Sequence, residues 1–518
     1  MKILQVGKFY PIRGGVEKVM YDLMEGLSGR NIRCDMLCAV TEQQKPGIIP
    51  LNDYAQLLCM TVWMKLYATM ISPAMILKLR KLRHEYDIVH IHHPDPMACL
   101  ALFLSGYKGK VVLHWHSDIL KQKMLLRIYK PLQKWLIKRA DVIVGTTPVY
   151  VRQSPFLKHV QDKTTYIPIG INELDIESDS ATSIKNQYSG RKIIFSLGRL
   201  VEYKGYEYLI EAAKYLNDDY IVLIGGDGHL KGKLEQQIEE LKVGEKVKLL
   251  GFVADNKEIA AYYSACDVFC ISSIWKTEAF GIVQIEAMSC GKPVIATRIA
   301  ESGVSWVNDD GVSGFNVEPQ NAEALAEAIK RIVSDSQLYS QLSASARQRY
   351  ETMFTREKMV DKCAGLYHDV LGKTISLPNQ SFFTEVKALL DEGKCVRIPV
   401  KGSSMRPFLQ NGDTVELLSV SGRKIHWGEI VLACTQKGHI VLHRVVFKKK
   451  DRLWLMGDAH SRQKEQITVG DVWAFSATAY RKGKMRKLDS FGMCCAVVCW
   501  FIAMPFRRLL LKIVDRLK

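Results

Sequence analysis

The sequence lacks several features that would place it in an unusual class of protein. It has no low-complexity tract, and with 47% apolar and 24% charged residues it does not have the composition of a disordered chain. Its thirteen cysteines show neither the paired spacings of a zinc site nor those of a disulfide framework, which fits a reducing cytosol. The amino terminus enters an apolar, strand-like run directly, without the layout of a signal peptide. We therefore expect a folded protein that lies mainly in the cytoplasm.

Acidic residues are scarce relative to basic ones. The chain has 54 Asp and Glu against 72 Lys and Arg, which gives a net charge of +18. This surplus predicts an acidic partner, namely nucleic acid, anionic lipid or a phosphorylated substrate. With 518 residues, the chain is long enough for three or four domains, each with its own core.

The first third of the chain alternates short apolar runs with helical stretches. Buried strands are expected at residues 2–7, 33–40, 87–92, 110–114 and 141–145. This alternation is typical of a doubly wound parallel sheet, whose ligands bind beyond the carboxyl ends of the strands. Gly14 and Gly15 lie at such a place, in a loop that opens a helix, and glycine lets backbone N–H groups approach an anion closely.

Histidines gather at the ends of two of these strands: His90, His92, His93, His114 and His116. Strand alternation puts His90 and His92 on one face, and His114 and His116 likewise, so a metal site is one alternative. No Asp, Glu or Cys joins them at ligand spacing, which favours side chains that line a cleft without a metal. We expect His116 to contact the reacting part of a substrate.

Two stretches, residues 57–84 and 120–139, are rich in cations and carry apolar residues at helical spacing. One interpretation is helices that cover the sheet with solvated cationic faces. The other is contact with a membrane surface or a lipid-linked acceptor, which needs both the cations and an apolar edge.

A second alternating pattern follows Asn172 and a polar segment. Strands are expected at 192–197, 220–224, 246–251, 267–271 and 294–296. Arg199 and Lys204 follow the first of these strands, where they can hold phosphate oxygens by charge-assisted hydrogen bonds, and Gly226 and Gly228 close the second strand. Two doubly wound domains facing each other predict a substrate cleft between them.

Glu278 and Glu286 bracket an apolar run with helical character that residues 291–293, Gly-Lys-Pro, terminate. Glu278 is expected in the loop at the helix amino terminus, and Glu286 about two turns along the helix. A loop with Phe280 and Gly281, followed by the free N–H groups of a helix start, suits a ligand that carries phosphate. Ordinary helix capping is the alternative for Glu278 taken alone.

Residues 1–373 resemble glycosyltransferase family 4, the retaining nucleotide-sugar enzymes of GT-B fold. The resemblance is carried by Gly14-Gly15, His116, Gly198-Arg199, Lys204-Gly205, Gly226-Asp-Gly228 and the run from Glu278 to Glu286. It implies that Arg199 and Lys204 bind the diphosphate of the donor and that Glu286 binds its ribose hydroxyls.

The same resemblance implies that Glu278, with backbone N–H groups near Phe280 and Gly281, holds the transferred sugar, and that His116 lies beside its anomeric centre. Fixed cations and amides can stabilise a departing nucleotide diphosphate, so no metal or other cofactor is expected. Paired glutamates are also found in glycosidases, but a glycosidase has no diphosphate to hold.

Beyond a predicted linker at residues 373–380, short apolar segments at 396–400, 414–418, 430–434 and 440–446 indicate an all-β unit. Five motifs resemble, in order, the boxes of the signal peptidase I and LexA-like serine peptidases: Gly402 to Pro407, Gly412-Asp413, Gly428 to Val431, His443-Arg444 and Gly457-Asp458-Ala459. The resemblance implies Ser404 as nucleophile, His443 as its base in place of the more usual lysine, and Asp458 as the residue that orients His443. The family's second acidic residue is missing here or displaced to Glu465. The domain is therefore either an active peptidase or a relative that has kept only a binding or regulatory role.

The chain ends with an apolar run of sixteen residues from Phe491 to Phe506, with cations on both sides. A helix of this length reaches roughly 24 Å, less than the about 30 Å thickness of the hydrocarbon layer. We therefore expect an interfacial anchor, with a short membrane span as the alternative.

The sequence thus predicts two facing Rossmann-like domains of a GT-B fold at 1–172 and 173–373, a small mostly-β peptidase-like domain at 381–488, and a membrane-associating helix at 489–518. Residues 343–371 resemble the terminal helices that pack back across both domains of this fold. The predicted function is sugar transfer from a nucleotide sugar to a glycan or lipid-linked acceptor, at the cytoplasmic face of an anionic membrane. Nucleic acid is not expected as a partner, because no reader motif is present. The alternative is a membrane-associated serine peptidase whose transferase-like part serves as a glycan-binding scaffold.

Overall fold

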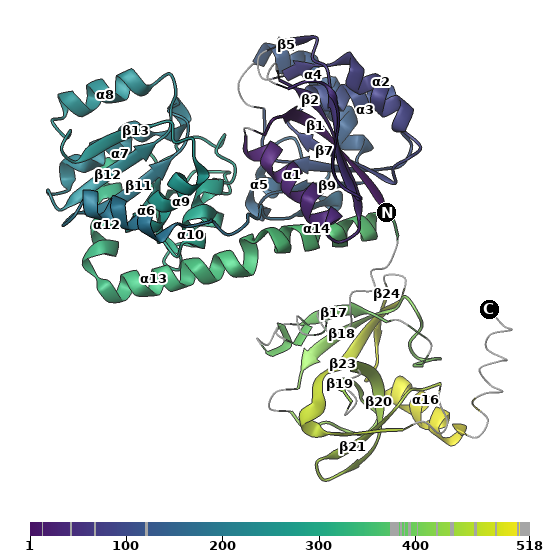
Figure 1. Ribbon diagram of the computed structural model, residues 1–518. Helices are drawn as coiled ribbons and strands as arrows, with labels where there is room; N and C mark the ends of the chain where they lie inside the picture. Colours follow the sequence, from purple (N-terminus) through teal and green to yellow (C-terminus); the bar gives the residue numbers. More distant parts are fainter. Residues whose placement is uncertain are drawn as a thin grey trace. The chain divides into compact units, whose positions relative to one another are not determined.

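We describe the protein from a computed structural model of the whole chain (Figure 1). The structure describes all residues except 13, 42–43, 67–68, 120–122, 373–382, 384–385, 388, 392–394, 401, 403, 421–422, 436–439, 460–463, 482–483, 505–506 and 508–518. The chain forms two compact units, Met1–Thr374 and Ile375–Lys518. The predicted linker at 373–380 lies outside the described residues.

The first unit begins with an eight-stranded sheet in the order β10-β9-β8-β7-β1-β2-β4-β3. Its strands are β1 (Lys2–Tyr10), β2 (Arg33–Val40), β3 (Gly47–Asn52), β4 (Ala55–Met60), β7 (Ile88–His93), β8 (Lys110–Trp115), β9 (Val142–Gly145) and β10 (Thr164–Tyr166). All neighbours pair in parallel except β3, which forms an antiparallel pair with β4. The helices of this part are α1 (Gly15–Ser28), α2 (Pro73–Leu82), α3 (Pro96–Ser105), α4 (Lys123–Arg139) and α5 (Pro148–Gln153). The predicted doubly wound sheet is confirmed, with β3 as an addition at its edge.

The helix expected over residues 57–84 is wrong in its first half. Residues 57–60 belong to β4, which pairs in parallel with β2, and β5 (Met64–Leu66) and β6 (Thr69–Ile71) form a separate antiparallel pair. Consecutive apolar residues at 57–59 are buried on both faces of the sheet, as in other parallel strands. The apolar residues of this segment fit both a helix with one apolar face and a buried strand. In the structure they form a buried strand. The helix expected at 120–139 is present as α4.

The second sheet has six parallel strands in the order β13-β12-β11-β14-β15-β16. They are β11 (Lys192–Leu197), β12 (Tyr220–Gly225), β13 (Val247–Gly251), β14 (Val268–Ile271), β15 (Val294–Thr297) and β16 (Gly314–Val317), with α6 (Ser178–Gln187), α7 (Tyr206–Ala212), α8 (Lys231–Glu240), α9 (Asn256–Ala265), α10 (Ile282–Ser289), α11 (Val304–Val307) and α12 (Ala322–Ser334) between and beside them. All five strands predicted for this part are therefore present.

Two long helices complete the first unit and return from the second sheet to the first. Helix α13 (Ser336–Arg349) packs against α10, and α14 (Arg356–Val370) packs against α1. Figure 1 shows them as one green, nearly continuous path beneath both sheets. Arg356 pairs with Glu25 of α1 at 2.8 Å, and Arg30 pairs with Asp361 at 2.9 Å. The predicted terminal helices that bridge both domains are thus confirmed.

The second unit is a mostly-β domain, as predicted. Its sheet has the order β17-β18-β23-β19-β20-β21-β22, with β24 paired to β23. The strands are β17 (Val396–Pro399), β18 (Thr414–Ser419), β19 (Ile430–Cys434), β20 (Ile440–Lys449), β21 (Arg452–Met456), β22 (Glu465–Thr468), β23 (Val472–Arg481) and β24 (Lys484–Lys487). Every pair is antiparallel.

The apolar run near the carboxyl end forms helix α16 (Phe491–Ile502), which packs against this domain. Trp500 donates its indole N–H to the carbonyl of Asp458 at 2.7 Å, and Val497 is buried. Phe491 and Ile502, in contrast, are 86% and 77% exposed. Within the described ranges, no helix is long and apolar enough to cross a membrane.

Arg444 and Asp458 form a buried ion pair in the second unit. The guanidinium Nε and Nη2 each donate to a different oxygen of Asp458 at 2.8 Å, and both side chains are at most 2% exposed. A charge taken out of water is tolerated only with such a partner. The pair therefore joins β20 to the loop that follows β21.

We predict that Arg444→Met destabilises this unit by about 3–5 kcal/mol, because it leaves the Asp458 carboxylate buried and unpaired. The double variant Arg444→Met/Asp458→Leu should recover most of that loss. Urea unfolding of the full chain, monitored by hydrogen exchange in β20 and β21, measures the free energy of unfolding of both variants. Equal losses in the single and double variants would contradict the role of the pair.

Candidate functional site

The second sheet places Lys204 and Glu278 in direct contact. Lys204 Nζ lies 2.5 Å from Glu278 Oε2, and the two side chains are only 11% and 12% exposed. Ser273 Oγ donates to the same carboxylate at 3.1 Å. Burial alone would lower the pKa of Lys204, but the charge of Glu278 outweighs it and the pKa is raised. A protonated lysine is thus held at the carboxyl end of β11.

Glycines let the chain fold closely around this lysine. Gly198 follows β11, and a Cβ there would lie 3.2 Å from Lys204 Nζ. Gly226, with φ +135°, lies so near the Gly198 carbonyl that a Cβ would meet it at 1.9 Å, and a Cβ on Gly228 would meet Leu200 O at 2.3 Å. The backbones of the loops after β11 and β12 therefore pack directly against each other, with no room for a side chain between them. Arg199 is exposed on the same loop, and its Nη2 donates to Tyr203 OH at 3.4 Å.

Helix α10 begins beside Glu278 and carries Glu286. Gly281, with φ +73°, forms its N-cap, and the neighbouring Phe280 is buried. The N–H groups of a first helical turn have no partner within the helix, so they remain available to an anion. Glu286 accepts a hydrogen bond from Tyr263 OH at 2.7 Å, and burial raises the pKa of its carboxyl.

The glycine loop of the first sheet reaches the same helix start. A Cβ on Gly15 would lie 2.9 Å from Ile282 Cδ1, the first residue of α10, and Gly14 is the N-cap of α1. Farther along, Lys276 Nζ of the second half lies 3.6 Å from Asp118 Oδ2 of the first half. The loop with Gly14 and Gly15 and the loop with Gly281 follow strands of different sheets, far apart in sequence. They therefore line one site.

His116 lies just beyond β8 and belongs to a buried row of imidazoles. His114 and His116 stack with ring centroids 4.2 Å apart, and His92 and His116 with centroids 5.2 Å apart. His116 Nε2 lies 2.9 Å from His92 Nδ1, and burial lowers the pKa of both rings well below the ordinary value. These histidines are neutral at physiological pH.

Three of these rings are the one group in the described part of the chain that could hold a metal ion. His90, His92 and His114 each bring a nitrogen atom within 4.8 Å of the others. Rings that bind one zinc ion need their nitrogens roughly 3.3 Å apart and aimed at a common point. Here the His90 and His114 rings are stacked with planes only 5° apart, so their lone pairs lie in two separate, nearly parallel planes and do not aim at a common point. The arrangement does not favour a metal, and its absence stays a prediction.

Comparisons with known proteins identify the family of this part of the chain. Residues 13–173 match the family described as Glycosyltransferase Family 4, and residues 178–349 match Glycosyl transferases group 1. Residues 13–349 therefore form glycosyltransferase domains.

Characterised relatives cover nearly the same part of the chain. The O-antigen chain mannosyltransferase C of Escherichia coli is 29% identical over 374 residues, 72% of this chain and 99% of the relative. D-rhamnosyltransferase WbpZ of Pseudomonas aeruginosa is 28% identical over 359 residues, 68% of this chain and 92% of the relative. A glycosyltransferase function of the kind found in polysaccharide synthesis is thus supported.

Solved structures share the GT-B fold. The sucrose-phosphate synthase of Thermosynechococcus elongatus aligns with a TM-score of 0.60 and 23% identity, over 72% of this chain and all of that chain. Anabaena HepE in complex with UDP aligns with a TM-score of 0.57 and 21% identity, over 71% of this chain and all of that one. The predicted fold class is confirmed.

The second unit carries a separate polar constellation. His443 Nε2 of β20 lies 3.3 Å from Ser404 Oγ, and His443 Nδ1 lies 2.8 Å from Glu465 Oε2 at the start of β22. Ser404 and His443 are thus brought together as predicted, but Asp458 as the residue that orients His443 is wrong. Its carboxylate is engaged by Arg444, and Glu465 takes the place beside His443.

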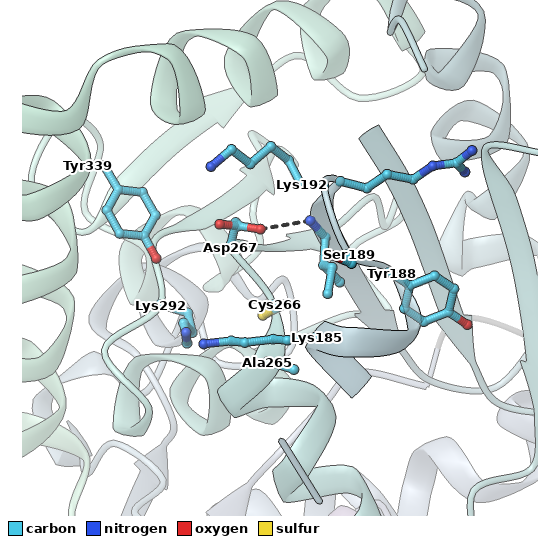
Figure 2. A pocket seen from close by; sticks show the side chains of 12 residues that line it. Lys185, Tyr188, Ser189, Lys192, Ala265, Cys266, Asp267, Lys292 and Tyr339 are labelled. Carbon is cyan, nitrogen blue, oxygen red and sulfur yellow. Dashed lines mark hydrogen bonds between the residues drawn. The ribbon is translucent and has the colours of Figure 1, made fainter. Parts of the chain in front are cut away.

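A cavity of about 410 Å³ lies in the glycosyltransferase part, away from these residues (Figure 2). It is lined by Lys192, Asp267 and Lys292, which precede or begin β11, β14 and β15, together with Lys185 and Tyr339. The loops that carry Lys204 and Glu278 follow the carboxyl ends of β11 and β14, whereas the cavity lies at the amino-terminal ends of these parallel strands, on the opposite edge of the sheet.

Several residues of the site escaped prediction from sequence. Ser273, Lys276 and Tyr263 bear no motif, and only the fold brings them to Glu278, Asp118 and Glu286. Gln5 did carry a signal, since it is a polar residue in the middle of a strand that is otherwise apolar. Its side chain is fully buried, and a buried amide needs partners.

Proposed function

We propose that residues 1–373 transfer a sugar, with retention of configuration, from a nucleotide diphosphate sugar to a glycan or lipid-linked acceptor. The observation that carries the proposal is the buried pair of Lys204 and Glu278, set between two glycine-rich loops and the start of α10. The cation suits the diphosphate of such a donor, and the Glu278 carboxylate with the free N–H groups suits its sugar hydroxyls. A second carboxylate, Glu286, suits the ribose of the nucleotide.

In this proposal, Lys204 and Arg199 neutralise the charge that develops on the diphosphate as the bond to the anomeric carbon breaks. Charges already fixed in place stabilise that charge without reorganising. Glu278 holds the sugar hydroxyls with the N–H groups near Phe280 and Gly281, and Glu286 holds the ribose.

His116 is proposed to lie beside the anomeric carbon. Because its ring is neutral, it can receive or give a single hydrogen bond there, and it places no positive charge next to a carbon that is itself becoming electron-poor.

The acceptor is proposed to be amphiphilic. One relative, 28% identical over 298 residues, is a Campylobacter jejuni transferase named for a diphospho-undecaprenol acceptor. The exposed apolar side chains Trp63 and Ile128, both 76% exposed, lie in the two cationic stretches of the first domain. Together with the net charge of +18, they support activity at the cytoplasmic face of an anionic membrane.

We expect Lys204→Met to lower the rate of sugar transfer at least a hundredfold, because the leaving group loses a buried cation. Lys231→Met, an exposed lysine of α8, is the matched control and should leave transfer unchanged. Transfer from a panel of nucleotide sugars measures both. Unchanged transfer in Lys204→Met would remove this lysine from the site.

Glu286→Gln is expected to weaken donor binding about tenfold, because a carboxylate accepts ribose hydroxyls more strongly than an amide does. Glu235→Gln, on the exposed face of α8, serves as its control. Calorimetric titration with the preferred nucleotide diphosphate measures the change. Equal affinity in the two variants would disprove the ribose assignment.

A second activity is proposed for the other unit, that of a serine endopeptidase. The observation that favours it is the chain Ser404, His443 and Glu465, with separations of 3.3 and 2.8 Å. In this arrangement His443 Nε2 takes the proton of Ser404 as its Oγ attacks a carbonyl carbon, and Glu465 holds the opposite ring nitrogen. His443 then returns the proton to the leaving amine.

We predict that a fluorophosphonate probe labels the full-length protein at Ser404. Ser404→Ala should abolish labelling, and Glu465→Gln should slow it about tenfold or more, because the imidazole loses its orienting carboxylate. Asp451→Asn, an exposed carboxylate in the turn between β20 and β21, is the control. Mass spectrometry of the labelled peptide would refute the proposal if the wild-type protein stayed unlabelled or if Glu465→Gln reacted like the control.

A further inference from the structure

A chain of hydrogen bonds leads from the backbone of α1 to His116. Gln5 Nε2 donates to the carbonyl oxygen of Met20 at 2.8 Å. A carbonyl oxygen can only accept, so this contact fixes which end of the amide is nitrogen. The other end, Oε1, then faces His92 Nε2 at 2.8 Å.

The orientation of Gln5 determines the tautomer of His92. Because Oε1 can only accept, His92 Nε2 must carry the hydrogen. The ring is fully buried and neutral, so its Nδ1 holds a bare lone pair. That lone pair faces His116 Nε2 at 2.9 Å, and only an N–H can satisfy it.

His116 therefore carries its hydrogen on Nε2, and its Nδ1 is a hydrogen-bond acceptor. Nδ1 is buried and has no partner within the described residues. An unsatisfied buried nitrogen is costly, and a ligand hydroxyl would satisfy it. The opposite tautomer would present an N–H at this position and repel such a donor.

We propose that Gln5 and His92 are positioning residues that fix the tautomer of His116, so that its Nδ1 accepts a hydrogen bond from a hydroxyl of the bound sugar. This inference rests on the proposed function for its ligand, but the tautomer itself can be observed without any substrate.

The test uses the full-length protein with ¹⁵N-labelled histidine, whose nitrogen shifts distinguish the two tautomers. His116 should carry its hydrogen on Nε2 in the wild-type protein and become mixed in His92→Leu and Gln5→Leu. His90→Leu is the matched control, because His90 is equally buried on the same strand face yet lacks a bond to His116. It should leave the tautomer unchanged.

Transfer rates complete the test. His92→Leu should lower kcat about tenfold more than His90→Leu, with similar donor KM in both. An Nδ1–H tautomer in the wild-type protein would overturn the proposal, and so would equal losses of kcat in the two variants. If the tautomer is as expected but no nucleotide sugar is turned over, the proposed function fails and the hydrogen-bond chain stands.

The cavity at the opposite edge of the second sheet supports an independent inference. Lys185, Lys192 and Lys292 line it, and within the described part of the chain none of the three forms an ion pair. Figure 2 shows the ammonium ends of Lys185 and Lys292 close together, near the hydroxyl of Tyr339. The one carboxylate, Asp267, already accepts a hydrogen bond from the backbone N–H of Ile193 at 2.7 Å.

The single carboxylate, Asp267, offsets only part of the positive charge of the three lysines, so a bound anion would stabilise the cavity. We infer that this cavity binds a phosphate group, either as a free ion or as the headgroup of a lipid. The ammonium groups of Lys185 and Lys292 and the phenol hydroxyl of Tyr339 supply donors for a dianion, while Figure 2 shows the Lys192 ammonium on the other side of Asp267. The loops that carry Lys204 and Glu278 follow the carboxyl ends of their strands, so this anion would leave the proposed donor site open.

The test compares Lys185→Ala/Lys292→Ala with Lys231→Ala/Lys233→Ala on α8, both in the full chain with Lys204→Met to weaken phosphate binding at the donor site. Inorganic phosphate should raise the Tm of the α8 variant by several degrees and leave the cavity variant unchanged if the ion is free. If the cavity variant floats less well than the α8 variant with phosphatidic acid vesicles, and the two float equally with phosphatidylcholine vesicles, the ligand is the lipid headgroup. Equal responses of the two variants to both probes would mean an adventitious ion only and overturn the proposal.

Discussion

The ion pair between Lys204 and Glu278 is the interaction on which the architecture of the first unit depends. A buried ammonium is tolerated only beside a carboxylate, and the two residues come from loops that follow different strands of the second sheet. Keeping them 2.5 Å apart requires the close approach of neighbouring loops, which in turn requires glycine at positions 198 and 226. A polar ligand that enters between them can replace part of this pairing, so the charges serve stability without a ligand and recognition with one.

Most strands of the two parallel sheets could be predicted from the sequence. A short, continuous apolar run can bury all its side chains as a strand that is covered on both faces. The prediction for residues 57–71 was wrong because such a run, when it also repeats at helical spacing, can form either structure. What decided the outcome was an open edge on β2, a tertiary feature that no local pattern records. The same holds for β3, whose pairing depends on β4 being a strand.

The motifs located the donor site more fully than the second site. Arg199, Lys204, Glu278 and Glu286 stand in the motifs that carry the resemblance to glycosyltransferase family 4, and that resemblance implies a common site for them. In the second unit, Asp458 lies within a motif, but its carboxylate is paired with Arg444. Glu465 lies outside any motif, at the start of β22, and contacts His443 of β20. Motif order identified Ser404 and His443, but choosing between two nearby carboxylates required knowing which one already had a partner.

The buried histidines show how a site can be tuned without a charged group. A row of buried imidazoles stays neutral, because each protonation would cost desolvation and repulsion from its neighbours. With charge excluded, the remaining variable is the position of one hydrogen on each ring. A single backbone carbonyl, that of Met20, sets it through Gln5 and His92. The packing of α1 on the sheet therefore decides whether His116 Nδ1 donates or accepts a hydrogen bond. The Met20 carbonyl that sets it is separated from the proposed substrate by Gln5, His92 and His116.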